Sequence, residues 1–241
     1  VRRNAGGLAE LARVKVAEGK PGEAIVLYSR YLRFRPDDAV AQAEFARLLI
    51  VRANAENASR GERAMAYDAV EAAVSKNPGD RRLRATLADF MLKAGRFGAA
   101  GEQLDILLAD DSTALADDGP ASEDDDAATV AQDRDALALM RARAHLGLGK
   151  YREAAALLAG LCGFDLESGS FPPRDPDTSP ADEKPAPVVY QASVFLSALL
   201  EEKLRSPAGA RVVLDHLVDT SPGDFRSWLA RANWHRSHDE L

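Results

Sequence analysis

Alanine and proline recur at a fixed distance along this chain. Three alanines are each followed by a proline twelve residues later, in the pairs Ala24 and Pro36, Ala66 and Pro78, and Ala210 and Pro222. A small residue lets two helices cross closely, and a proline stops a helix. The pattern therefore predicts a repeated helical unit, and stacked units of this kind commonly present a surface that binds another protein.

The beginning of the chain shows one such unit at full length. Apolar and small residues follow helical spacing from Leu8 up to Gly19, and again from Ala24 up to Pro36. Gly19 and Pro21 suit the turn between them, because glycine closes a helix in the left-handed conformation and proline fits the first turn of the next. The pattern predicts two antiparallel helices that cross closely at Ala24.

These residues resemble the tetratricopeptide repeat, a helix-turn-helix unit of about 34 residues with small residues at its eighth and twentieth positions and a proline near its end. The first unit matches it with Leu11, Ala12, Gly19, Ala24, Tyr28, Tyr31 and Pro36. The resemblance implies an all-α fold, a solenoid of helix-turn-helix units wound into a right-handed superhelix, with two unstructured insertions.

The resemblance divides the chain into five units and one further helix. The units are residues 5–38, 39–80, 81–111, 135–162 and 189–224, and residues 225–241 form either the first helix of a sixth unit or a cap. The second unit is longer than the repeat, and the excess is expected between its helices, near residues 53–63. The apolar residues Trp228, Leu229 and Trp234 favour continuation of the array, because a capping helix should be polar outside.

Two segments interrupt the pattern. The linker 112–134 belongs to a stretch, residues 110–133, that carries nine acidic residues and no basic one, so the net charge of −7 reflects this stretch and not the helices. A solvated linker is the simpler interpretation, and a lure for a basic partner is the alternative. The insertion 163–188 holds six of the twelve prolines and is expected to be extended.

Composition sets further limits. No apolar run is long enough to span a bilayer, so no membrane insertion is expected in this segment. The chain begins at Val1 without a methionine or a secretory signal pattern, which indicates a fragment of a longer protein and leaves the compartment open, with the cytoplasm slightly favoured. The alanine-rich composition, with more arginine than lysine, is typical of a bacterium with a GC-rich genome. The single cysteine, Cys162, excludes an internal disulfide and is expected to be a small buried residue.

No set of residues predicts catalysis, a cofactor or a metal. The segment 147–150 lacks the glycine spacing and the hydroxyl residue of a phosphate-binding loop. His235 and His238 have a spacing that could hold a metal, but a solvated helix is the simpler interpretation. His145 is expected at the edge of the core. This fragment is therefore predicted to be non-enzymatic, with any catalytic domain elsewhere in the parent protein.

The resemblance also implies that the first helix of each unit lines a concave groove. The residues selected in this way are Glu10, Arg13 and Val16 in the first unit, Glu44, Arg47 and Ile50 in the second, and Arg82, Asp89 and Leu92 in the third. Arg13 and Arg47 would suit carboxylates of a partner, and the three apolar residues would form a strip beside them. The alternative is a solvated face with internal pairs such as Glu44 with Arg47.

The groove residues indicate a protein or peptide as the partner. One tetratricopeptide subgroup binds the carboxylate tails of chaperones through basic residues and asparagines. The matching positions here contain two basic residues and no asparagine, so binding of a chaperone tail is not expected; these positions are Ala9, Arg13, Glu44, Arg82 and Thr86. Binding of nucleic acid through Arg81, Arg82 and Arg84 is not expected, because no aromatic residues alternate with them. The prediction is a scaffold that binds a partner segment in its groove. The alternative is a regulatory or substrate-recruiting region of a larger bacterial enzyme, such as a kinase, peptidase or glycosyltransferase.

Overall fold

The computed structural model describes residues 5–114, 127–172 and 186–238, and their regular structure is helical apart from one isolated β-bridge. This confirms the predicted all-α class. The chain divides into two compact units, Val1–Ala94 and Gly95–Leu241, which are described separately.

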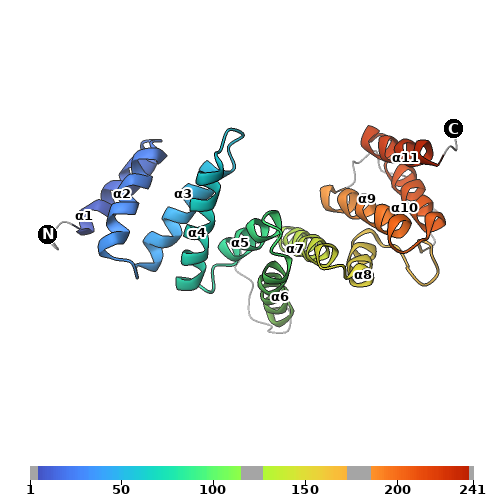
Figure 1. Cartoon of the computed structure of the whole chain (residues 1–241), viewed down its shortest axis with the longest axis horizontal. Coiled ribbons are helices and arrows are strands. Elements are labelled where there is room, and N and C mark those ends of the chain that lie inside the picture. Colours follow the sequence, from blue (N-terminus) through green and yellow to red (C-terminus); the bar gives the residue numbers. More distant parts are fainter. Residues whose placement is uncertain (1–4, 115–126, 173–185, 239–241) are drawn as a thin grey trace. The chain divides into compact units, whose positions relative to one another are not determined.

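The first unit contains five helices (Figure 1). They are α1 (Ala5–Ala17), α2 (Pro21–Phe34), α3 (Ala39–Ala53), α4 (Arg60–Lys76) and α5 (Arg81–Lys93). Helix α1 packs on α2 and α3 packs on α4, while α2 also contacts α3 and α4 contacts α5. Successive helices of this unit are therefore neighbours in space, as expected for stacked helical hairpins.

Small residues are completely buried in the packed helices of the first unit. Ala12 and Ala24 are completely buried between α1 and α2, and Ala46 and Ala66 are completely buried in α3 and α4. Tyr28 is almost as deeply buried and packs in the same cluster as Ala12 and Ala24. The complete burial of Ala24 agrees with the close crossing predicted there.

An aspartate two residues after each of three repeat prolines begins the following helix. Asp38 Oδ1 accepts a hydrogen bond from the Ala41 amide at 3.0 Å, and Asp80 Oδ1 accepts one from the Leu83 amide at 3.0 Å. Asp224 does the same for the Arg226 amide at 3.1 Å. Each aspartate satisfies an amide that the first turn of its helix leaves without a partner.

The connection between α3 and α4 lies in the region where extra length was predicted. Residues 54–59 join the two helices, and α4 begins with a capping box formed by Ser59 and Glu62. The Ser59 amide and hydroxyl and the Arg52 guanidinium all donate to the Glu62 carboxylate, which lowers the pKa of Glu62 to about 2. This box fixes the start of α4.

The second unit contains the helices α6 (Phe97–Ala114), α7 (Ala127–Gly147), α8 (Tyr151–Cys162), α9 (Pro187–Glu202), α10 (Pro207–Thr220) and α11 (Phe225–Ser237). Its core includes Leu158, Leu196 and Val213, from α8, α9 and α10. Trp234 of α11 is buried in this core, whereas Trp228 and Leu229 are about half exposed. Only part of the apolar face predicted on this helix is therefore uncovered.

Both predicted insertions contain more structure at their ends than expected. Helix α6 runs to Ala114 and α7 begins at Ala127, so the ends of the acidic segment 112–134 are helical. Residues 115–126 lie outside the described residues.

The start of the proline-rich segment is folded, which corrects the prediction of an extended excursion. Phe164 is buried, its ring lies 5.2 Å from that of Phe171, and Phe171 stacks on His216 of α10 at 3.5 Å. The bridge between Asp165 and Ser170 closes the turn that brings the two phenylalanines together. Residues 173–185 lie outside the described part of the chain.

Four of the turns between described helices use a left-handed residue at one fixed place. Gly19, Gly95 and Gly149 each lie two residues before the next helix and have φ values of 72°, 73° and 72°. Arg205 takes this place before α10, with φ of 54°. Ser206 follows it at the N-cap position, and its side chain makes no capping hydrogen bond.

Candidate binding site on helices α1 and α3

A pocket with a volume of about 300 Å³ opens between α1 and α3 in the first unit. Its wall is formed by Arg13 and Val16 of α1, Tyr28 of α2, and Glu44, Arg47, Leu48 and Val51 of α3. The structure therefore brings together four residues that were predicted for the groove, namely Arg13, Val16, Glu44 and Arg47.

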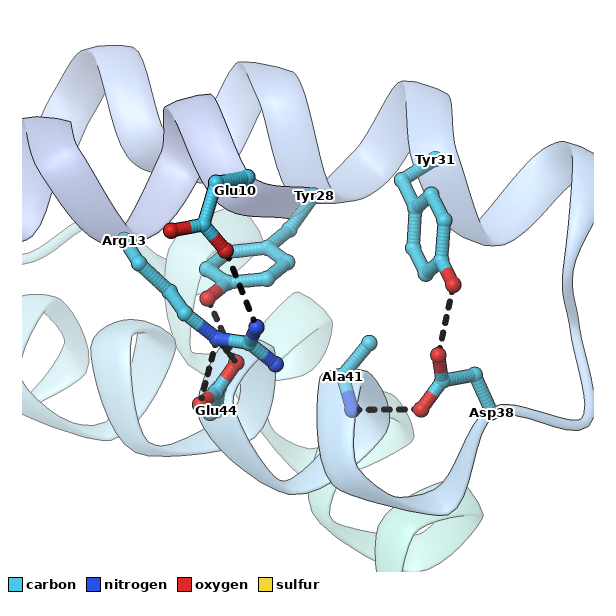
Figure 2. A network of polar contacts seen from close by, with 7 residues as sticks. All are labelled: Glu10, Arg13, Tyr28, Tyr31, Asp38, Ala41 and Glu44. Carbon is cyan, nitrogen blue, oxygen red and sulfur yellow. Dashed lines mark hydrogen bonds and ion pairs between the residues drawn. The ribbon is translucent and has the colours of Figure 1, made fainter. Parts of the chain in front are cut away.

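A polar network connects the three helices around this pocket (Figure 2). The Tyr28 hydroxyl donates a hydrogen bond of 2.5 Å to Glu44 Oε2. Arg13 Nε lies 3.2 Å from Glu44 Oε1, and Arg13 Nη1 lies 3.4 Å from Glu10 Oε2. Glu44 thus joins α3 to both α1 and α2 through one carboxylate.

The network shifts the ionisation of its members. Burial and the hydrogen bond to Glu44 raise the pKa of the Tyr28 phenol well above its ordinary value. The hydrogen bond and charge of Glu44 also raise the pKa of Arg13. Both shifts keep Tyr28 and Arg13 protonated, so both continue to donate hydrogen bonds to the Glu44 carboxylate.

Arg47 does not form the predicted internal pair with Glu44. Its Nη2 atom lies 2.7 Å from Asp80 Oδ2, at the start of α5. Arg13 and Arg47 each have a carboxylate of this chain as a partner. The two guanidinium groups are therefore not the free carboxylate-binding pair that the sequence suggested.

A second polar contact fixes the start of α3 against α2 (Figure 2). The Tyr31 hydroxyl donates a hydrogen bond of 2.6 Å to Asp38 Oδ2, while the other oxygen of Asp38 caps α3. The Ala41 amide and the Tyr31 hydroxyl lower the pKa of Asp38. Glu44 and Arg47 lie about one and two helical turns after Ala41 on α3. The contact between Tyr31 and Asp38 therefore helps to set their position in the pocket.

The apolar part of the wall consists of Val16, Leu48 and Val51. Val51 is 70% exposed and Val16 is 44% exposed, so both present their side chains to solvent. Leu48 and Val51 lie four residues after Glu44 and Arg47 and therefore on the same side of the helix. Sequence reasoning missed both residues, although this spacing could have indicated them.

The other predicted groove residues do not line the pocket. Ile50 is half-buried, and Arg82 is exposed. Asp89 forms an ion pair of 2.5 Å with Lys93 on the same helix. Leu92 is only 6% exposed, so its side chain is not available for the apolar strip that was predicted with Val16 and Ile50.

Other residues singled out in the sequence are buried in the fold or make contacts with other residues of this chain. Burial lowers the pKa of His145 and raises that of Cys162. His238 Nε2 lies 3.2 Å from Glu201 Oε1. Arg84 is buried and donates a hydrogen bond of 2.6 Å to the Pro78 carbonyl, so it is not part of an open basic surface.

The described ranges contain no group of three or more histidine, cysteine, aspartate or glutamate residues that could hold a metal ion. Within the same ranges, no helix is both long enough and apolar enough to cross a membrane.

The helical hairpins with buried alanines have a tetratricopeptide-like fold, and comparison with solved structures agrees. A tetratricopeptide repeat protein from Parabacteroides merdae is similar with a TM-score of 0.61 and 12% identity, over 99% of this chain and 75% of that one. YrrB, described as a tetratricopeptide protein with an unusual peptide-binding site, has a TM-score of 0.59 and 13% identity over 93% and 90% of the two chains.

MamA from Desulfovibrio magneticus is also similar, with a TM-score of 0.54 and 13% identity over 90% of this chain and 94% of that one. No family model matches the sequence, and no curated protein matches it. At these identities the likeness concerns the fold.

Proposed function

We propose that this chain is a non-enzymatic protein-interaction scaffold, and that a segment of its partner binds in the pocket between α1 and α3. The pocket itself carries this proposal, because it combines exposed apolar side chains with positioned polar groups on neighbouring helices. Its volume of about 300 Å³ is at the lower end of the range for ligand sites, which suits a few side chains of a peptide. The similarity of the fold to YrrB, whose description includes a peptide-binding site, supports the same class of function.

The two arginines at this pocket have further donors for a partner. Arg13 uses Nε and Nη1 for its ion pairs, and Arg47 uses Nη2. A guanidinium group carries five N–H donors, so each side chain can donate to a bound segment without losing its internal partner. The proposed polar contacts of Arg13 and Arg47 are of this kind.

A substitution in the exposed wall tests the proposal. Random dodecapeptides are selected on the immobilised full chain, and the affinities of the selected peptides are then measured for the wild type and for Val51→Asp. We expect Val51→Asp to weaken binding at least tenfold, because it places a charge in the apolar wall. The matched control is Val26→Asp, since Val26 is an exposed valine of α2 that does not line the pocket.

Val26→Asp should leave the affinity within about twofold of the wild type, as is usual for surface sites outside an interface. Equal binding by Val51→Asp and the wild type, or no enrichment of any peptide, would contradict the proposal.

A further inference from the structure

We infer that the segment bound between α1 and α3 carries no acidic side chain at the pocket and enters the pocket with a branched aliphatic or aromatic side chain. This inference rests on the proposed function and specifies the chemistry of the partner. It differs from the expectation of a carboxylate-bearing partner that the two arginines suggested in the sequence.

The charges around the pocket are already paired within the chain. Arg13 pairs with Glu44 and Glu10, and Arg47 pairs with Asp80. Glu44 also accepts the Tyr28 hydroxyl at 2.5 Å. With two cations and three carboxylates in these pairs, the surroundings of the pocket offer no excess of positive charge to an acidic segment.

An acidic side chain could reach Arg13 only close to Glu44, whose side chain is 30% exposed. Two carboxylates at such a partly desolvated position repel each other. A carboxylate at Arg47 would likewise approach Asp80, which is held in place because its other oxygen caps α5. Both arginines are thus shielded from anionic partners by groups that the fold itself fixes.

An apolar side chain meets no such opposition. Val16, Leu48 and Val51 offer it a wall of aliphatic groups, and Tyr28 also lines the pocket. Covering Val51 and Val16 would remove exposed apolar surface from water, which favours binding. The remaining N–H groups of the arginines suit neutral acceptors, such as the backbone carbonyls of the same segment.

An apolar partner predicts that the affinity of the bound segment depends little on salt concentration. Burial of apolar surface depends little on ionic strength, whereas attraction between exposed charges is screened within about 10 Å at 0.1 M salt. The probes are fluorescein-labelled dodecapeptides of glycine, serine and asparagine that carry, at two fixed positions, either Leu, Val or Phe, or else Asp or Glu. Their affinities for the full chain are measured by fluorescence anisotropy at 50 mM and 500 mM NaCl.

We expect the apolar probes to bind at least tenfold more tightly than the acidic probes, with less than a threefold change between the two salt concentrations. Val51→Asp should reduce the affinity of the apolar probes at least tenfold. Arg47→Gln should weaken it by only about threefold, because the glutamine amide can still donate to a neutral acceptor of the segment. Arg47 is the arginine chosen for neutralisation because Arg13 also holds Glu44.

The other outcomes separate this inference from the proposed function. If the acidic probes bind more tightly, weaken at least tenfold in 500 mM NaCl and are lost with Arg47→Gln, the apolar partner is wrong while the binding site remains. If dodecapeptides selected in the preceding experiment bind independently of Val51, or if none is selected, the proposed site and the inference both fail.

Discussion

Glu44 is the residue that organises the pocket, although its ion pair with Arg13 adds little to the stability of the fold. It accepts Tyr28 of α2 and Arg13 of α1, and so holds side chains from two other helices around one carboxylate. Ion pairs as exposed as Arg13 with Glu44 contribute about 0–1 kcal/mol. The role of the pair is therefore to orient the wall of the pocket and to neutralise it.

Residue spacing predicted burial better than it predicted ion pairs. Ala12, Ala24 and Ala66 were identified from the repeat, because a close helix crossing admits only a small side chain at that place. The partner of Arg47 could not be identified in this way, because a long side chain can reach carboxylates on its own helix or on a neighbouring one. The structure places Arg47 on Asp80, which lies 33 residues away in the chain.

Arg205 predicts a stabilising substitution. Its φ of 54° lies in the left-handed region, which glycine occupies at the equivalent turns. Arg205→Gly should therefore raise the free energy of unfolding by about 0.5–1 kcal/mol, after the greater flexibility of unfolded glycine is deducted. Urea unfolding followed by tryptophan fluorescence measures this, since both tryptophans lie in the same compact unit as Arg205.

Gly149→Ala is the reciprocal control, because it places a side chain at φ of 72° in the same type of turn. It should lower the free energy of unfolding by about 1 kcal/mol. Equal stability of Arg205→Gly and the wild type would show that the left-handed conformation of Arg205 costs nothing.

At the scale of elements, the sequence predicts boundaries well where a proline and an aspartate act together. The proline ends one helix, and the aspartate two residues later caps the next, as Asp38, Asp80 and Asp224 show. Boundaries were missed where neither signal is present. Helix α7 begins at Ala127, in a stretch read as a linker because its acidic composition masked the helical segment.

The folded start of the proline-rich segment was missed for a different reason. Proline content there indicated a chain without regular structure, and this remains correct for the backbone of residues 164–172 apart from one bridge. The order comes from side chains, because Phe164 and Phe171 contact each other and Phe171 stacks on His216. A contact with a residue more than forty positions later has no local signature in the sequence.

The packing of α6 on α7 predicts that one added methyl group, at Gly147 of α7, lowers the stability of the protein. A Cβ atom added at Gly147 would collide with the ring of Phe97. Gly147→Ala should therefore lower the free energy of unfolding by about 1–3 kcal/mol, the usual cost of overpacking. Urea unfolding by circular dichroism and fluorescence measures the change.

The matched control is Gly160→Ala in α8, where an added Cβ atom meets no other atom within 4 Å. This change should stabilise the protein by about 0.5–1 kcal/mol, because alanine loses less backbone entropy in a helix. Similar effects of the two substitutions would contradict the described contact between Gly147 and Phe97.

At the scale of the whole molecule, the chain consists of two compact units, and the candidate site lies entirely within the first. The division falls at Gly95, inside the segment 81–111 that the sequence suggested as one repeat. Gly95 has the same left-handed conformation as Gly19 and Gly149, so a local pattern could not distinguish this turn from those inside a hairpin.

The second unit also exposes apolar residues, so its helix α11 is an alternative place for the partner segment to bind. Phe225, Trp228 and Leu229 of α11 are 73%, 48% and 54% exposed. Trp228 is held at the surface by a hydrogen bond of 2.9 Å from its Nε1 to the Pro222 carbonyl. The pocket between α1 and α3 combines exposed apolar side chains with positioned polar groups, and we therefore expect the first unit to bind the partner segment.

Methyl chemical-shift mapping of the full chain tests this central claim most directly. The protein is labelled at valine and leucine methyl groups and titrated with the Leu-containing dodecapeptide. The account predicts saturable shifts at Val16, Leu48 and Val51, with Val26 and Val212 unchanged. Shifts concentrated at Leu229 instead, with the pocket methyl groups unmoved, would contradict it.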